Sequence, residues 1–292
     1  MDDSKALNWL LVIFIVLNIS LGVGNYQKYI TAYRLSDESV EQIIAFLKAG
    51  NIEVSDELPR EYGAINTINI IPVNITLDLR EYLVDSFFGP ERLGVTITEI
   101  LEDTAYDNKL RVYKRNNMSL TFSTYQILFK DESIEINSQV SEREALKYAE
   151  AFYKLHGYNK LGKKVKIDYK KESYGASVTY YELYNNLPIF DSYLCMQITQ
   201  DGVFSSLMQF SEVKEENNNR NEIYAVNQVL FKLHQIIEPT GITTITDIVF
   251  GYAREQIGNV FFFKEEAVPT YRITLEGVNT PLYVNAYTNE LK

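Results

Sequence analysis

The sequence is poor in the residues that most often build catalytic and metal sites. It contains one cysteine, Cys195, and two histidines, His156 and His234, and its 14 glycines are scattered. One cysteine excludes an intramolecular disulfide but says nothing about the compartment. No cluster of histidine and cysteine has the spacing of a metal site, and no glycine-rich phosphate-binding motif is present. We therefore expect no metal site and no cofactor.

The residues that could form a nucleophilic site are poorly placed for one. Cys195, a histidine and Asp191 have the composition of a nucleophile, a base and an orienting acid. Cys195, however, lies within an alternating strand pattern, not on a strained turn or at a helix N-terminus where a thiol would be activated. His156 precedes Gly157 at a predicted helix end, where a cation would complement the helix dipole, and His234 flanks an apolar stripe. We expect no catalytic residue and a protein that is not an enzyme.

Basic residues are also scarce. The chain has 28 Lys and Arg against 39 Asp and Glu, a net charge of −11. Because phosphate backbones repel such a surface, nucleic-acid binding is excluded as a main activity. A hydrophobic content of 46%, with 22 Tyr and 15 Phe, is sufficient for a large core and favours strands.

The N-terminal segment has no charged residue between Lys5 and Lys28, and its apolar run covers 7–23. That length predicts a single transmembrane helix. A buried core helix and a cleaved signal peptide are the alternatives; small residues at Ser20, Gly22 and Gly24 allow cleavage, but the segment before Leu7 is not net positive. We expect a retained anchor with a cytoplasmic N-terminus. The orientation rests on the usual translocation of a long following domain, since flanking charges are balanced.

One face of this helix carries two amides and a glycine. The face comprises residues spaced three or four apart, namely Asn8, Leu11, Ile15, Asn18 and Gly22. Asn and Gly favour contact with another helix in lipid, so this face is a candidate partner surface. The alternative is that Asn8 lies among the lipid headgroups and Asn18 is tolerated.

Three further helices are predicted from caps and apolar spacing. Ser36 begins the first, which Gly50 ends in a left-handed conformation. Ser141 and Glu144 form a capping box for the second, which runs to Gly157. The third has apolar residues from 226 to 237 and stops before Pro239, and a shorter helix is predicted over 78–88.

The remaining segments alternate as strands and predict an α+β fold of helix-covered antiparallel sheets. The expected strands cover 66–77, 109–130, 164–170, 176–184, 189–199, 203–213, 242–253, 260–263, 271–275 and 282–287. Residues 200–202 form a hairpin turn. We expect an anchor region at 1–28, an N-terminal lobe at 29–138 and a C-terminal lobe at 139–292. The C-terminal lobe reads as two similar units of one helix and four strands, 139–213 and 222–292.

A run of lysines marks the strand predicted at 164–170. It includes Lys160, Lys163, Lys164, Lys166, Lys170 and Lys171. One interpretation is a docking site for an acidic partner or lipid headgroups. The other is an edge strand that lysines protect from unwanted pairing.

Four stretches resemble the YycI family of two-component regulatory proteins of Gram-positive bacteria. They are the N-terminal anchor, AFLKAGNIEVSDELPREY (45–62), LYNNLPIFDSYLCMQIT (183–199) and PTYRITLEGVNTPLYVNAYTNE (269–290). The last is similar to the closing hairpin of PepSY-type modules, except that Asn285 and Asn289 stand where Asp and Gly are usual. The resemblance implies an extracytoplasmic, non-enzymatic regulator of a YycG-like (WalK-like) sensor histidine kinase that acts on cell-wall metabolism.

The partners that the resemblance implies are the kinase and a YycH-like protein, bound partly through transmembrane helices. For the exported contact, the candidate region is the strand segment with Ile189, Phe190, Asp191 and Tyr193. The alternative function is an exported PepSY-like module that inhibits a protease or binds a cell-wall ligand.

Overall fold

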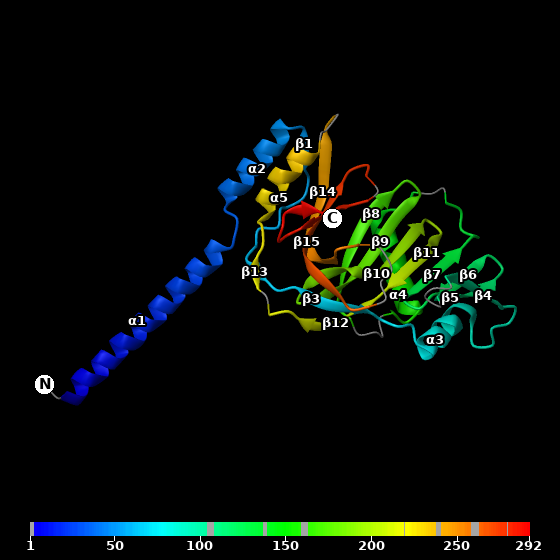
Figure 1. The fold of residues 1–292 in the computed structure, drawn as a ribbon, viewed down its shortest axis with the longest axis horizontal. Helices are drawn as coiled ribbons and strands as arrows, with labels where there is room; N and C mark the ends of the chain where they lie inside the picture. The colour runs from blue at the N-terminus through cyan, green and yellow to red at the C-terminus, as the bar shows by residue number, and fades with distance from the viewer. Residues whose placement is uncertain are drawn as a thin grey trace. The chain divides into compact units, whose positions relative to one another are not determined.

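The computed structural model describes residues 3–103, 108–136, 139–158, 163–218, 220–237, 241–257, 263–278 and 280–292. The chain forms two compact units, between which it passes several times (Figure 1). Unit 1 comprises Met1–Ile65, Arg220–Val249 and Tyr271–Leu291. Unit 2 comprises Asn66–Asn219, Phe250–Thr270 and Lys292. Strands β14 (Thr243–Arg254) and β15 (Glu265–Leu275) therefore have residues in both units.

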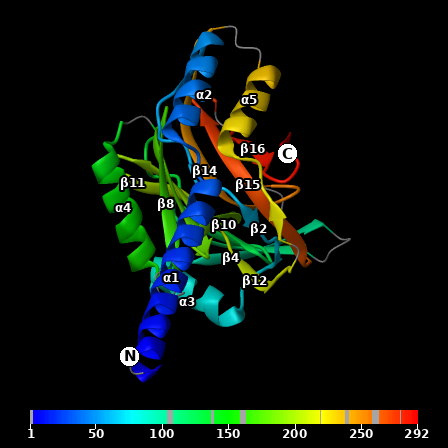
Figure 2. The same ribbon diagram turned by 90° about the vertical axis from the view of Figure 1, so that its left-hand side faces the viewer.

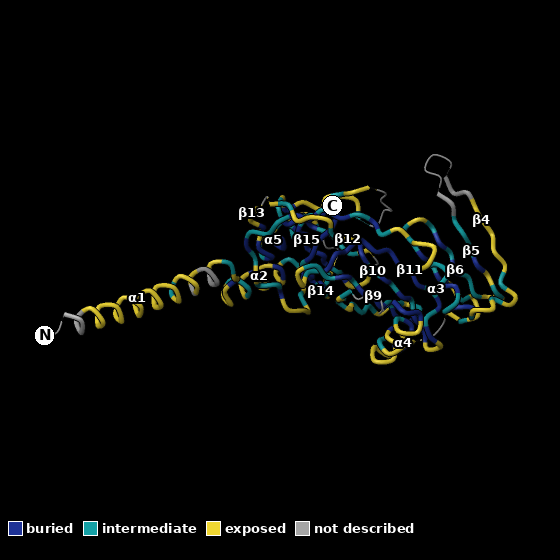
Figure 3. The backbone as a smooth tube through the Cα atoms, turned by 90° about the horizontal axis from the view of Figure 1, so that it is seen from below, coloured by how far each residue is buried: buried dark blue, intermediate teal, exposed yellow. Residues whose placement is uncertain are grey.

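The first helix, α1 (Asp3–Ala32), contains the predicted apolar segment. Its stretch Leu7–Tyr26 has a mean hydropathy of 2.1, and none of it is buried (Figure 3). The length and composition of this stretch are sufficient to cross a membrane, and an N-terminal signal sequence has the same properties.

Unit 1 pairs two helices with short strands. Helices α2 (Asp37–Ala49) and α5 (Val226–Ile236) lie side by side (Figures 1 and 2). Strand β1 (Ile52–Val54) pairs in parallel with the Thr243 end of β14. Strand β2 (Ala64–Ile65) pairs with β13 (Asn221–Glu222), and β16 (Leu282–Asn285) pairs with β17 (Glu290–Leu291).

The ends of α2 confirm one prediction and correct another. Ser36 caps the helix, since its side chain accepts a hydrogen bond from the Ser39 backbone. Gly50 does end the helix, but its φ of −97° is not left-handed; Asn51, with φ of 60°, takes that conformation. A Cβ at Gly50 would lie 1.8 Å from His234 Nε2, so a larger residue there would displace the His234 ring. The glycine allows α2 and α5 to approach each other.

Unit 2 is built on one long sheet. The strands follow the order β12-β3-β15-β14-β10-β11-β7-β6-β5-β4, and β9 and β8 branch from β10. Their bounds are β3 (Ile68–Pro72), β4 (Thr96–Asp103), β5 (Asn108–Arg115), β6 (Met118–Phe122), β7 (Gln126–Asp131), β8 (Val165–Glu172), β9 (Gly175–Tyr184), β10 (Leu187–Thr199), β11 (Gly202–Gln209) and β12 (Ser211–Glu216).

Two helices complete the core of unit 2. Helix α4 (Glu142–Leu155) begins with the predicted Ser141–Glu144 capping box and packs against β8 to β11. Helix α3 (Leu77–Phe88) buries Leu83, Val84, Phe87 and Phe88. With the inward faces of the strands they form a continuous apolar core that includes Phe122, Phe129, Phe152, Leu194, Met196 and Ile198.

The α+β class is confirmed, with several differences in detail. Most strand pairs are antiparallel, as expected, but β1–β14 and β10–β14 are parallel. The strand expected over 203–213 is divided into β11 and β12 at Phe210. The strand expected over 260–263 lies mostly outside the described residues. The similarity of the two units at 139–213 and 222–292 stays a prediction, as does the division of the chain at 28 and 138.

Candidate functional site

The partner face predicted on α1 is exposed along its whole length. Asn8, Leu11, Ile15, Asn18 and Gly22 all lie on α1 and are solvent-accessible in the isolated chain. A Cβ placed on Gly22 would meet no atom within 4 Å. A second helix could therefore approach the α1 backbone at this point without displacing anything.

Asn18 does not stand on this face as an open amide. Its Nδ2 donates to the carbonyl of Phe14, 2.7 Å away and one turn earlier on α1. This bond lowers the free-energy cost of placing the amide in lipid, because one of its two N–H donors already has a partner. Asn18 can therefore lie in lipid without a partner, and its carbonyl oxygen is an acceptor that a donor on a second helix could use.

The segment of β10 chosen as an exported contact surface lies in the interior. Ile189, Phe190 and Asp191 are buried, and Tyr193 is half-buried. Ile189 pairs with Tyr252 of β14, and Tyr193 pairs with both β9 and β11. Alternation could not reveal this burial, because consecutive residues are buried over 188–192, so both faces of β10 are covered there. A partner that docks on the folded unit would not reach Ile189, Phe190 or Asp191, and a contact at Tyr193 stays a prediction.

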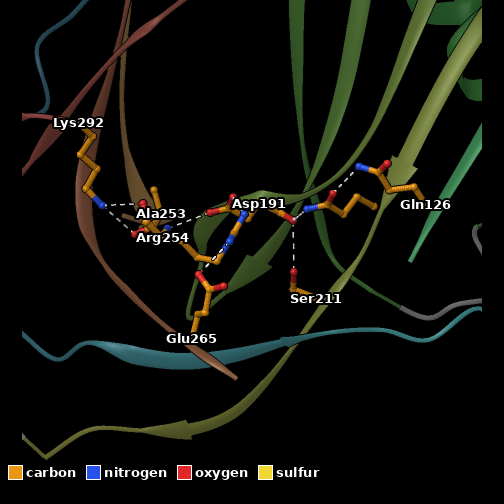
Figure 4. Close-up of polar contacts among 8 residues, drawn as sticks. Gln126, Asp191, Ser211, Ala253, Arg254, Glu265 and Lys292 are labelled. Atoms are coloured by element: carbon orange, nitrogen blue, oxygen red, sulfur yellow. Dashed lines mark hydrogen bonds and ion pairs between the residues drawn. The ribbon is translucent and has the colours of Figure 1, made fainter. Parts of the chain in front are cut away.

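Asp191 is the centre of a buried ionic network (Figure 4). Its Oδ2 accepts a hydrogen bond from the Arg254 backbone at 2.9 Å, and its Oδ1 lies 3.2 Å from a guanidinium nitrogen of Arg254. The same guanidinium donates to Glu265 Oε2 at 2.9 Å. The network thus connects β10, β14 and β15 within unit 2. Two carboxylates therefore compensate the charge of Arg254: that of Asp191, which is buried, and that of Glu265, which is partly exposed.

The network lies where the ladder of β10 is interrupted. The pairing of β10 with β9 changes register between Pro188 and Tyr193, so regular main-chain bonds are lost there. Side chains replace them: the Asp191 carbonyl accepts from Gln209 Nε2 and Ser211 Oγ, both at 3.2 Å. The Ser211 backbone in turn donates to Ser192 Oγ at 2.8 Å. These bonds supply the partners that buried backbone groups need.

A second buried carboxylate borders this break. Glu182 Oε2 accepts from Ser192 Oγ at 2.6 Å and from Lys163 Nζ at 2.7 Å. Burial raises the pKa of Glu182, and Lys163 and Ser192 act in the opposite direction without cancelling the effect. Glu182 of β9 and Ser211 of β12 both bond to Ser192 of β10, so these polar contacts connect the three strands.

Lys292 adds a cation at the other end of the network. Its Nζ donates to the carbonyls of Ala253 and Arg254, at 3.0 and 2.9 Å (Figure 4). Burial lowers the pKa of this amine to about 8, partly offset by the carboxylates of Glu255 and Asp191. The sequence alone did not identify Arg254, Glu265 or Lys292 as members of this network. The one signal was for Arg254, a charged residue directly after the apolar run 248–253.

The two histidines and the cysteine have structural surroundings. His156 is buried, its ring stacks on Phe87 with centroids 3.5 Å apart, and its Nδ1 lies 3.1 Å from Ser86 Oγ. Burial lowers the pKa of His156 to about 4, so the expectation of a cation at this helix end is wrong. His234 lies against Phe46 with ring centroids 4.7 Å apart.

Cys195 lies in β10, as expected, with its Sγ 3.4 Å from Ser177 Oγ. Within the part of the chain that the structure describes, no group of three or more His, Cys, Asp or Glu could hold a metal ion. That the protein is not an enzyme stays a prediction.

The lysine-rich segment contains an edge strand. Among the described strands, β8 pairs with β9 alone, which leaves its other edge open. Lys166, Lys170 and Lys171 lie on this strand, Lys163 and Lys164 precede it, and Lys160 lies outside the described residues. The arrangement is that of an edge protected by charge.

These features define an α+β protein with an apolar N-terminal helix. No family model matches the chain, and no curated protein matches it. Among solved structures, it is similar to an uncharacterized protein from Eubacterium rectale, at 12% identity and a TM-score of 0.57, over 82% of this chain and 90% of that chain. It is also similar to the C-terminal domain of YpeB from Bacillus megaterium, at 13% identity and a TM-score of 0.41, over 75% of this chain and 96% of that domain. The first likeness shows a shared fold.

Proposed function

We propose that this protein is a membrane-anchored, non-enzymatic regulator of a sensor histidine kinase in a two-component system. It acts together with a YycH-like protein, and its N-terminus is cytoplasmic and its main domain extracytoplasmic. The observation that carries the proposal is the stretch Leu7–Tyr26, which is apolar, unburied and marked on one face by Asn8, Asn18 and Gly22. The family resemblance of the sequence supplies the kind of partner.

The proposed contact on α1 is physically simple. Lipid provides no hydrophobic force between helices, so association depends on close packing and on polar groups. Gly22 allows a neighbouring backbone to approach, since nothing occupies the space beside it. Asn8 adds an amide one heptad before Ile15 on the same face. Together, Gly22 and Asn8 make this face of α1 the one that favours contact with another helix.

Regulation needs only a difference in affinity for two kinase states. A contact that binds one state tenfold better shifts their ratio tenfold, about 1.4 kcal/mol. One helix–helix contact in a membrane is of this order, because interhelical hydrogen bonds there contribute about 0.6–2 kcal/mol. Regulation of this kind requires no catalytic step by the protein itself.

Photo-crosslinking in membranes tests this proposal. A crosslinking amino acid at Ile15 lies on the amide-and-glycine face, while one at Ile13 lies about 200° round the same helix. Both side chains are exposed and of the same type, so the second is a matched control. We expect a histidine kinase to be crosslinked from position 15 and much less from position 13, and Asn18→Leu to reduce the yield. Recovery of no histidine kinase, or equal yields from both positions, contradicts the proposal.

A further inference from the structure

Unit 1 has a groove between α2 and α5. Its volume is about 620 Å³, within the roughly 300–1,000 Å³ typical of ligand sites. Ser39, Ile43 and Phe46 line it from α2, Phe231 and Lys232 from α5, and Asn289 from the C-terminal turn. All of these residues belong to unit 1.

The floor of the groove is apolar. Phe46 and Phe231 stack on each other, with ring centroids 5.0 Å apart and an interplanar angle of 29°. Phe231 is nevertheless 48% exposed, which is high for a phenylalanine that already has an aromatic neighbour. Each ring covers one face of the other, and Phe46 also lies against His234, so the accessible aromatic surface of the groove is mainly that of Phe231, beside Ile43. Such an apolar surface suits an aliphatic side chain, whose burial there would remove apolar area from water.

The walls are unusually rich in carboxamides. Five of the residues that line the groove are of this kind, namely Gln42, Asn227, Gln228, Gln235 and Asn289. A carboxamide has one acceptor and a donor group, the same pair that a peptide group presents. In a helix the peptide groups are bonded internally, so among peptides only an extended segment could bond to this lining through its main chain.

Asn289 provides a separate indication of a ligand. Its exposure is 9%, its Nδ2 donates to the Gln228 carbonyl, and its Oδ1 has no hydrogen-bond partner among the described residues. A buried acceptor without a partner is costly, and the terminal torsion of Asn turns easily. The oxygen is itself buried, so a donor that enters from the groove reaches it when the carboxamide rotates and exchanges its bond to the Gln228 carbonyl for one to the ligand.

The charge of the groove differs from that of the chain. No acidic residue lines it, and Lys232 is its one charged residue, in a protein with a net charge of −11. A cationic ligand would find no counter-charge in this lining. An uncharged or acidic ligand would meet Lys232 favourably.

We propose that the α2–α5 groove binds an extended, neutral to acidic peptide segment that places one aliphatic side chain against Phe46 and Phe231. The carboxamide walls bind its main chain, and Lys232 selects against basic sequences. The proposal does not depend on the partner of α1.

The test is a selection of random nine-residue peptides on the full-length protein in lipid nanodiscs. We expect enriched peptides with a shared aliphatic position and few lysines or arginines. Phe231→Ser should weaken their binding about tenfold or more, because a central aromatic anchor is lost. Asn289→Gly should also weaken binding, while the φ of 55° at this position suits glycine and preserves the backbone.

Leu155→Ser is the matched control, since Leu155 is a strongly exposed apolar residue on α4 outside the groove. It should leave peptide affinity unchanged, with all variants showing the circular dichroism of the parent. The proposal is overturned if no peptide is enriched, or if Phe231→Ser binds the enriched peptides as well as the parent does. It is also overturned if an N-acetylglucosamine tetramer binds with the same Phe231 dependence, or if Phe231→Ser changes a dimer into a monomer.

Discussion

Replacing Asp191 with alanine should destabilise unit 2 strongly. The side chains of Asp191 and Arg254 are 0% and 2% exposed, so the change leaves a guanidinium buried without its inner carboxylate. Breaking a buried ion pair typically costs about 3–5 kcal/mol. Glu265, 40% exposed, still faces Arg254, which places the expected loss near the lower end, at about 3 kcal/mol. That is a large part of the roughly 5–15 kcal/mol that stabilises a domain.

The double variant Asp191→Ala with Arg254→Met distinguishes the cost of an unpaired buried charge from the loss of the other contacts that Asp191 makes. Removing both charges eliminates the uncompensated cation, so we expect a loss of only about 1 kcal/mol, mainly from the Arg254 backbone donor that Asp191 satisfies. Glu265→Gln is the surface control, with an expected effect below about 1 kcal/mol.

Urea unfolding of the full chain in detergent, followed by far-UV circular dichroism, measures these differences. Tryptophan fluorescence is unsuitable because the one tryptophan, Trp9, lies in α1. The predicted dependence of stability on the buried ion pair fails if Asp191→Ala loses less than about 1 kcal/mol. It also fails if the double variant is as unstable as the sum of the two single variants.

Two pH dependences follow from the buried bases. The folded-state pKa of His156, about 4, lies below the ordinary 6.5, so the unfolded chain binds a proton first and stability falls as pH decreases from about 6.5. Relative to His156→Phe, the parent should lose about 2 kcal/mol between pH 7 and pH 5 in urea unfolding, and an unchanged difference would refute this. Lys292, with a folded-state pKa of about 8, destabilises the fold while it is charged, so stability should rise between pH 8 and 10 relative to Lys292→Met. A difference between these two proteins that does not vary over that range would contradict the burial of the Lys292 amine.

Local features were predictable because their hydrogen bonds connect neighbouring residues. The Ser36 cap and the Ser141–Glu144 box span three positions each, and both are present in the structure. The turn at 200–202 likewise joins β10 and β11 as expected. The apolar length of α1 needed no tertiary information at all.

Features that depend on distant residues were not predictable. The partner of Asp191 is 63 positions away, and alternation alone made its strand segment look half-exposed. The reason for Gly50 is the side chain of His234, and the neutral state of His156 follows from its cover by Phe87 and Phe152. The α2–α5 groove joins three segments that are separate in sequence. Such contacts between distant residues can be identified only in the folded structure.

In the proposed function, the N-terminal helix takes part in regulation as well as in attachment. The most direct test replaces residues 1–28 with a cleavable export signal and measures the output of the two-component system in cells. Exchange of 1–28 for an unrelated transmembrane helix serves as the matched control for attachment alone. We expect both replacements to lose regulation while the domain is exported in normal amount. Full regulation by the released domain would contradict this expectation.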